Sequence, residues 1–205
     1  MNAAKRLSAV ILTGGPSPLF GPDATRAEFA RERLIERLAW TLAEFPFERF
    51  ALVAPPGKAG VEPDGVAVLA DDDQGVGPVA GIVTALRRLP GGIFVAAGNM
   101  PFVSAEMVEW LLAHDDPEAG GIIPRHRGGI EPFFAIYNKR ALPHVETALA
   151  DRDSLAGELE KSTVRYVELP DQFSALYDFT RVHTPQEYER ALEALEKKHS
   201  SVAVR

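Results

Sequence analysis

A short apolar run that stops at a glycine pair constrains the fold of this chain more than any other feature. Residues 9–13, Ala-Val-Ile-Leu-Thr, are apolar or β-branched without alternation, which is typical of a strand buried on both faces. Gly14 and Gly15 end the run, and the prolines that follow prevent regular structure up to Asp23. Because glycine lacks a Cβ, backbone N–H groups in such a loop can approach an anion closely.

The position of this loop indicates a nucleotide site, because open α/β sheets bind nucleotides beyond the carboxyl end of the first strand. The loop matches neither G-x-G-x-x-G nor G-x-x-x-x-G-K-[ST], so it supports neither a dinucleotide cofactor nor a P-loop. Two glycines alone fit a connection that binds nothing equally well.

The rest of the chain alternates strand-like and helix-like segments. Strands are expected over residues 50–53, 66–69, 93–97, 120–124, 131–137 and 164–169. Helices are expected over residues 33–45, 79–89, 104–113, 139–149, 154–160 and 185–198. Residues 25–32 stay open between helix and loop, although Thr25-x-x-Glu28 resembles a capping box.

This alternation predicts an α/β fold: a Rossmann-like, three-layer αβα arrangement with a mostly parallel sheet. We expect one domain over residues 1–198, with residues 199–205 as a flexible tail. No cysteine is present, which excludes thiolate metal sites and cysteine nucleophiles. A net charge of −7 without a Lys/Arg cluster argues against nucleic-acid binding, and no apolar run is long enough to cross a membrane. A cytoplasmic location is therefore expected, while the sequence does not specify an oligomeric state.

A second glycine-containing loop follows the strand expected at residues 66–69. Three aspartates, residues 71–73, precede Gly77, and Pro78 stands where the first turn of a helix tolerates proline. Such an acidic run is commonly a solvated loop, but its place before a glycine loop makes a cation site equally reasonable.

Four separated stretches together resemble the molybdenum cofactor guanylyltransferases. They are residues 12–17 (Leu-Thr-Gly-Gly-Pro-Ser), Asp71 with residues 77–82 (Gly-Pro-Val-Ala-Gly-Ile), residues 99–102 (Asn-Met-Pro-Phe) and residues 179–185. They occur in the family's order and with its spacing, and the match extends over nearly the whole chain. The resemblance implies a GT-A-like nucleotidyltransferase fold, so the expected chemistry is mainly the placement and charge neutralisation of phosphates.

The resemblance also implies substrates and site residues. The donor would be GTP with Mg²⁺, the acceptor molybdopterin and the leaving group pyrophosphate. Guanine is favoured because guanylyl members carry Gly-Gly in the first loop where cytidylyl relatives carry Ala-Gly. The nucleotide-binding residues would be Leu12, Thr13, Gly14, Gly15, Asp71 and Gly77. Asn99 and Asp71 would be catalytic, with Asn99 as the metal ligand.

The first loop departs from the family pattern, which reads Leu-x-Gly-Gly-x-Ser-x-Arg-Met-Gly-x-Asp-Lys. Leu19 stands for the arginine, Phe20 for the methionine and Ala24 for the lysine. Hydrogen bonds to charged groups contribute roughly 1.5–3 kcal/mol each, so the loss of two cations predicts much weaker donor binding or catalysis. Arg26 is a candidate substitute for the lysine.

Later motifs differ as well. Asn99 stands for the metal-binding aspartate of Asp-Met-Pro, and Pro55 for a base-contacting asparagine. Arg181 and His183 flank the valine of what is Asn-Val-Asn in the family. An amide oxygen can ligate Mg²⁺, but a hard cation favours a carboxylate. Residues 71–73 are candidate replacements for the lost carboxylate, and Arg181 or His183 for acceptor contacts.

Two functional classes therefore remain open. In one, the chain is a working nucleotidyltransferase with an altered phosphate site, which includes the use of another base or acceptor. In the other, it is a non-catalytic relative that binds a nucleotide, a pterin or a protein partner. The intact glycine loops favour the first class.

Overall fold

The strand β1 (Leu7–Leu12) is the centre of the structure, as the unbroken apolar run predicts. All six of its residues are buried, and it lies between β4 and β6, parallel to both. This computed structural model describes residues 3–13, 28–29, 32–54, 66–71, 77–151, 154–173 and 179–202. Gly14, Gly15 and the rest of the first loop lie outside the described residues.

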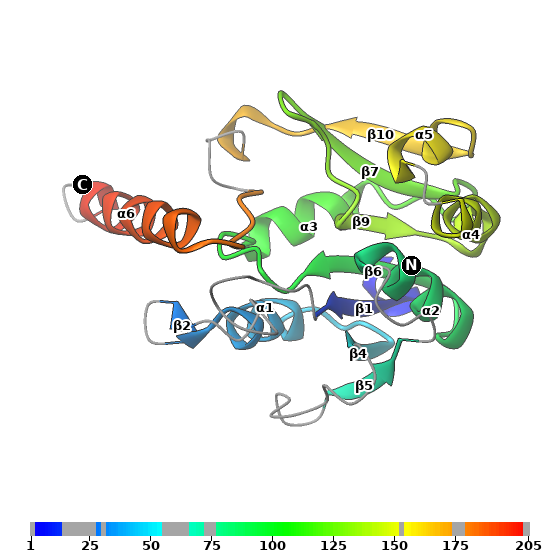
Figure 1. Ribbon diagram of the computed structural model, residues 1–205, viewed down its shortest axis with the longest axis horizontal. Coiled ribbons are helices and arrows are strands. Elements are labelled where there is room, and N and C mark those ends of the chain that lie inside the picture. The colour runs from blue at the N-terminus through cyan, green and yellow to red at the C-terminus, as the bar shows by residue number, and fades with distance from the viewer. Residues whose placement is uncertain are drawn as a thin grey trace.

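The described strands form one large sheet and one small ladder. The other strands are β2 (Glu28–Phe29), β3 (Glu32–Arg33), β4 (Arg49–Ala54), β5 (Ala67–Ala70), β6 (Gly92–Ala97), β7 (Gly121–His126), β8 (Gly129–Ile130), β9 (Phe134–Tyr137) and β10 (Val164–Glu168). The order in the large sheet is β10-β7-β9-β6-β1-β4-β5, with β8 paired to β7 (Figure 1). The central pairs are parallel, whereas β9 runs antiparallel to both β6 and β7.

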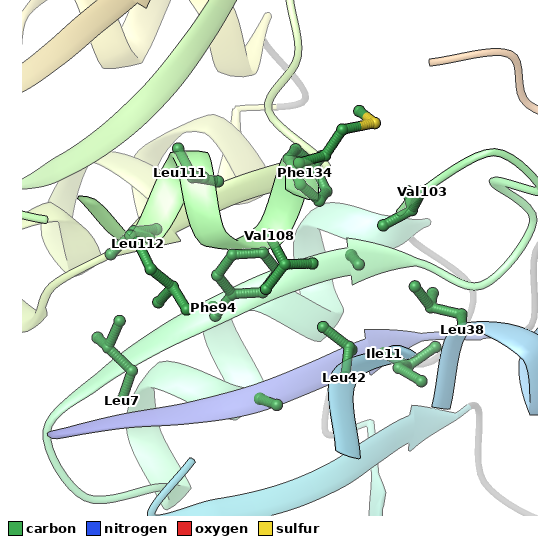
Figure 2. Close-up of a cluster of buried hydrophobic side chains, with 14 of the residues drawn as sticks. Leu7, Ile11, Leu38, Leu42, Phe94, Val103, Val108, Leu111, Leu112 and Phe134 are labelled. Atoms are coloured by element: carbon green, nitrogen blue, oxygen red, sulfur yellow. The ribbon is translucent and has the colours of Figure 1, made fainter. Parts of the chain in front are cut away.

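Helices cover both faces of the sheet. They are α1 (Leu34–Ala43), α2 (Pro78–Arg88), α3 (Ala105–Ala113), α4 (Leu142–Ala150), α5 (Leu155–Glu160) and α6 (Pro185–Val202), with 3-10 turns at Ala3–Arg6, Lys139–Ala141 and Asp171–Phe173. α1 and α3 pack on one face (Figure 2), and α2, α4 and α5 pack on the other. The expected three-layer α/β fold with a mainly parallel central sheet is confirmed.

Alternation along the central strands divides the core between these two faces. In β1, Ile11 joins the α1/α3 side and Val10 joins the α2 side; in β6, Phe94 and Val95 are divided in the same way. The ring of Phe94 meets Phe134 edge-on with a centroid separation of 5.3 Å. Both faces of the sheet are therefore apolar, which is why these strands read as continuous hydrophobic runs.

Two helix starts follow the predicted capping chemistry. Ser104 Oγ accepts the Met107 N–H at 3.4 Å, and this hydroxyl also lowers the pKa of the Glu106 carboxyl by hydrogen bonding. Thr184 Oγ1 accepts the Glu187 N–H at 3.2 Å, while the Glu187 carboxylate accepts the Thr184 N–H at 3.0 Å. This second arrangement is a capping box that fixes the start of α6.

The structure differs from expectation at three places. The strand expected over residues 131–137 begins only at Phe134, and residues 132–133 form a turn. Within residues 25–32, the described part is strand: β2 and β3 pair antiparallel before α1 begins. α6 continues to Val202, beyond the expected end at Lys198, because residues 199–202 contain no proline or glycine to stop it. Through Ala191 and Leu195, α6 packs against Phe102, and its far end extends away from the sheet (Figure 1).

Replacing Gly121 with alanine is expected to lower the free energy of unfolding by about 2 kcal/mol. A Cβ at this position in β7 would lie 2.4 Å from the Ile136 carbonyl oxygen, a backbone atom of the neighbouring strand. Gly157→Ala is the matched control, because in α5 the new Cβ would meet only Ser154 Cβ at 3.9 Å. The control should gain about 0.5 kcal/mol. Urea denaturation of both variants measures this, and equal stabilities would contradict the packing of β7 on β9.

Candidate nucleotide site

The described part of the predicted site lies at one edge of the sheet, where parallel strands end. The Thr13 N–H donates to the Val53 carbonyl at 2.9 Å, and the Gly98 N–H donates to the Leu12 carbonyl at 2.9 Å. The Asp71 N–H donates to the Ala54 carbonyl at 2.8 Å. These bonds continue the ladders of β1, β4, β5 and β6 by one residue, and ligands of open α/β sheets bind beyond this edge.

Asp71 is held by a buried hydrogen bond. Its side chain is almost fully buried, and the Thr84 hydroxyl in α2 donates to Asp71 Oδ1 at 2.9 Å. The bond ties the end of β5 to the second turn of α2 and fixes the orientation of the carboxylate. The family motif predicted Asp71 as a site residue. Thr84 was not predicted, because a threonine within an apolar helix gives no sequence signal of its own.

Gly77 caps the start of α2 in a conformation that requires glycine. Its φ is 86° and its ψ is −169°, a region that residues with a Cβ avoid. Pro78 occupies the first helical turn, as predicted. α2 begins at Pro78, shortly after Asp71, so its N-terminus lies near the same edge of the sheet, and a helix N-terminus favours anions.

Leu12 and Thr13 lie at this edge but are engaged by the fold. The Leu12 side chain is buried in the core beside α2, and the Thr13 hydroxyl donates to the Val53 carbonyl at 3.0 Å. Any contact of Leu12 with a nucleotide would therefore come from its backbone. The roles of both residues, and those of Gly14 and Gly15, stay predictions.

Asn99 follows β6 and meets the chain that leads into α6. The Val182 N–H donates to the Asn99 carbonyl at 3.0 Å, and Asn99 Nδ2 lies 3.4 Å from the Val182 carbonyl oxygen. The same Nδ2 lies 3.3 Å from His183 Nδ1 and 3.2 Å from His183 Nε2. Asn99 is buried and His183 is exposed, so the imidazole covers the amide from the solvent side.

We call residues 179–184 the strap, because this segment crosses the carboxyl ends of β6 and β7 before α6 begins. Arg181, in the middle of the strap, forms a two-pronged ion pair with the buried Glu131, with N–O distances of 2.7 and 2.8 Å. The Glu131 carboxylate also accepts the Phe133 N–H at 3.0 Å, and the guanidinium lies 4.9 Å from the centre of the Phe133 ring. The charge of Arg181 is thus compensated inside the protein.

The antiparallel β9 explains how Glu131 reaches this edge. Because β9 runs opposite to β6, the residues before β9 lie next to the residues after β6. Tyr137, at the far end of β9, donates its hydroxyl to the Pro132 carbonyl at 2.8 Å. Burial raises the pKa of the Tyr137 phenol well above its usual range, and the Glu131 carboxylate adds to the effect. Two interactions therefore hold the loop before β9: the hydrogen bond from the uncharged Tyr137 hydroxyl and the ion pair between Glu131 and Arg181.

The strap also brings an aromatic pair to the edge. The ring of Phe179 lies 5.3 Å from His126 at the end of β7 and 5.5 Å from Phe134 in the core.

The predicted turn at residues 125–129 is confirmed as the β7–β8 hairpin. Arg125 stacks on Tyr166, with its guanidinium 4.7 Å from the ring centre.

Several predicted positions lie outside the described residues: Leu19, Ala24, Arg26, Pro55, and residues 72–73. Asp71 and Asn99, the two predicted catalytic residues, are described and do not touch. Asp71 follows β5 and Asn99 follows β6, and both β1 and β4 lie between these two strands. The two residues therefore lie at different positions along the edge.

The magnesium ion that the resemblance implies would need oxygen ligands at this edge of the sheet. Within the described residues, no group of three or more His, Asp or Glu side chains is placed to hold a metal. Asn99 presents its amide nitrogen, a hydrogen-bond donor, toward His183, and Asp71 Oδ1 already accepts from Thr84. Mg²⁺ prefers carboxylates and phosphate oxygens, so the Asn99–His183 pair does not fit it.

The parallel sheet, the entry to α2 and the carboxylate at the same edge are typical of α/β folds that bind nucleotides at the carboxyl ends of their strands. The family comparison makes this specific. Residues 9–165 match the MobA-like NTP transferase domain, and the chain belongs to this family.

Curated relatives span nearly all of the chain. A probable molybdenum cofactor guanylyltransferase of Pelotomaculum thermopropionicum is 32% identical and covers 90% of this chain and 91% of its own. A protein of the same description from Geobacillus sp. (strain WCH70) is 29% identical over 90% of this chain and 97% of its own. The crystal structure of molybdopterin-guanine dinucleotide biosynthesis protein A from Archaeoglobus fulgidus superposes with a TM-score of 0.76, at 26% identity, covering 93% of this chain and all of that one. No described helix is both long and apolar enough to span a membrane.

Proposed function

We propose that this chain transfers GMP from GTP to molybdopterin and releases pyrophosphate. A phosphate oxygen of the acceptor attacks the α-phosphorus of GTP, and the bond between that phosphorus and the oxygen bridging to the β-phosphate breaks. The observation that carries the proposal is that residues of two separate family motifs, Asp71 with Gly77 and Asn99, lie at one edge of the sheet. A cytoplasmic location belongs to the same proposal, since GTP is a cytoplasmic metabolite.

The residues of the chain would act mainly by positioning, as phosphoryl-group chemistry needs. The backbone amides of Gly14, Gly15 and the entry to α2 would hold the triphosphate. Asp71, fixed by Thr84, would orient the nucleoside, and the strap would border the acceptor. A bound divalent cation would neutralise charge on the phosphates.

Calorimetry tests the donor before any acceptor is needed. GTP should bind in the presence of a divalent cation, and CTP and ATP should give markedly smaller heats. Gly77→Ala should weaken GTP binding about tenfold, because alanine cannot hold this backbone conformation without strain of about 1–3 kcal/mol. The measurement is a titration of each nucleotide into wild type and variant.

Gly129→Ala is the matched control for this titration. Gly129 also has a positive φ, 122°, with no atom within 4 Å of an added Cβ, but it lies in the β7–β8 hairpin. Its GTP affinity should equal that of wild type. Equal heats for GTP and CTP would remove the guanine assignment. GTP binding without pyrophosphate release in the presence of molybdopterin would identify the non-catalytic relative.

A further inference from the structure

A hollow opens on the sheet where β4 and β5 begin and α2 ends. Its volume is about 730 Å³, which is within the range of sites that bind small molecules. Its walls include Arg49 and Ala51 of β4, Ala67 and Leu69 of β5, and Arg88 with Leu89 at the end of α2. We call it the β5 hollow, after the last strand in the order of the large sheet (Figure 1).

The length of the strands separates the β5 hollow from the candidate nucleotide site. Arg49 is the first residue of β4 and Ala54 is the last, and a rise of about 3.3 Å per residue puts them about 16 Å apart. Asp71 lies at the far end of this span, where its N–H donates to the Ala54 carbonyl. The hollow therefore lies at the amino ends of β4 and β5, away from the carboxyl ends where a donor and an acceptor would meet.

Two guanidinium groups give the β5 hollow a positive charge. Arg49 and Arg88 both line it and are both exposed, and none of the described residues that line it is acidic. No described residue forms an ion pair with Arg49. Arg87, the neighbour of Arg88 in α2, is engaged elsewhere, because its Nε donates to Glu146 Oε1 of α4 at 2.9 Å. The hollow therefore attracts anions.

The carboxyl end of α2 does not cancel this charge. The last carbonyl groups of a helix carry partial negative charge, which repels an anion. Here Lys139 Nζ donates to the Leu89 carbonyl at 2.7 Å and also to the Leu86 carbonyl. A cation thus compensates the end of the helix that borders the hollow, and an anion can approach Arg88.

The rest of the wall is mainly apolar. Ala51 and Leu69 belong to the face of the sheet on which α2 packs, and Leu89 is buried in the same cluster. Leu69 is only half-buried and Ala67 is exposed, so part of this apolar surface still faces solvent. An apolar group that covers it gains free energy because water is released from both surfaces.

From these features we infer that the β5 hollow binds a phosphate monoester that carries an aromatic ring. Such a phosphate group has a charge of about −1.5 to −2 at neutral pH, which matches two guanidinium groups. Arginine also binds phosphate oxygens through paired N–H groups. The phosphate lies between Arg49 and Arg88, and the ring lies on the apolar wall formed by Ala51, Ala67 and Leu69. The inference goes beyond the proposed function and does not depend on it.

Phenyl phosphate is the probe that tests the inference by calorimetry. It should bind wild type about tenfold more tightly than inorganic phosphate, because only the ester covers the apolar wall. Arg49→Gln and Arg88→Gln should each weaken its binding about tenfold, because each removes a charge-assisted hydrogen bond. Both side chains are exposed, so both variants should keep the circular dichroism spectrum of wild type.

Arg87→Gln is the matched control, because it removes the same charge one residue away from Arg88, on a side chain paired with Glu146. It should keep the wild-type affinity for phenyl phosphate. Gly77→Ala should keep it as well, since Gly77 lies at the other end of α2.

Three results would overturn the inference: no binding of phenyl phosphate to wild type, equal affinities for the three arginine variants, or a loss of affinity confined to Gly77→Ala. The last of these would place the ester at the candidate nucleotide site. GTP is titrated separately, and Arg49→Gln should bind it as wild type does. Failure of GTP to bind would overturn the proposed function alone, while loss of phenyl phosphate binding in Arg49→Gln would still support the β5 hollow.

Discussion

The triple variant Leu19→Arg, Ala24→Lys and Asn99→Asp is expected to release pyrophosphate from GTP at least a hundredfold faster than wild type when Mg²⁺ is the cation. The family resemblance places the first two side chains at the donor phosphates, and Asn99 lies two residues beyond the end of β6. One electrostatic contact to a developing charge is worth about 100- to 1,000-fold in rate, so partial recovery is still measurable. The assay contains GTP, Mg²⁺ and molybdopterin.

Ala113→Lys is the control for net charge. The triple variant adds two positive charges and one negative charge, a net gain of one, and Ala113→Lys adds the same net charge at an exposed position at the end of α3. This control should release pyrophosphate at the wild-type rate. Brisk release from wild type would show that other residues already fill the three roles. A folded triple variant no faster than wild type would show that these positions do not face the reacting phosphates.

Replacing Arg181 with methionine is expected to lower the free energy of unfolding by about 3 kcal/mol. The substitution leaves the Glu131 carboxylate, whose side chain is 4% exposed, without its cation. Because Arg181 itself is 31% exposed, the loss should fall at the lower end of the cost of breaking a buried pair. Urea denaturation monitored by circular dichroism measures the difference.

Two further variants separate the buried charge from other effects. Arg140→Met breaks the pair between Arg140 and Glu118, which has the same 2.8 Å contact but side chains 57% and 78% exposed, so it should cost less than about 1 kcal/mol. Adding Glu131→Gln to Arg181→Met should restore part of the stability, because an amide is cheaper to bury than a carboxylate. Equal losses for Arg181→Met and Arg140→Met would show that Arg181 does not compensate a buried charge.

The central strands and the helices could be predicted because their signals are local. β1 and β6 are buried on both faces, so each appears in the sequence as an unbroken apolar run. Ser104 and Thr184 each mark the start of a helix, because the side chain accepts the backbone N–H of the residue three positions further along. The capping pattern Thr25-x-x-Glu28 gave a misleading signal, because Glu28 begins a short antiparallel ladder and not a helix.

The candidate site could be predicted only in part, because its contacts join residues far apart in the chain. The motifs placed Asp71, Gly77 and Asn99 at one edge through the rule that parallel strands end together. They could not show that Asn99 meets His183 or that Glu131 meets Arg181, 50 residues away. Arg181, an expected acceptor contact, proves to be bound to Glu131, and this leaves His183 as the exposed basic side chain of the strap.

The position of β9 between β6 and β7 sets an order of assembly during synthesis. β1, β4 and β5 leave the ribosome first, and β6 joins the open side of β1 once residue 97 is made. β7 emerges next but belongs beyond β9, so it has no place in the sheet until residue 137 follows. A nascent chain can therefore complete the β5-β4-β1-β6 part of the sheet early, while β9 and β7 join it together in a later step.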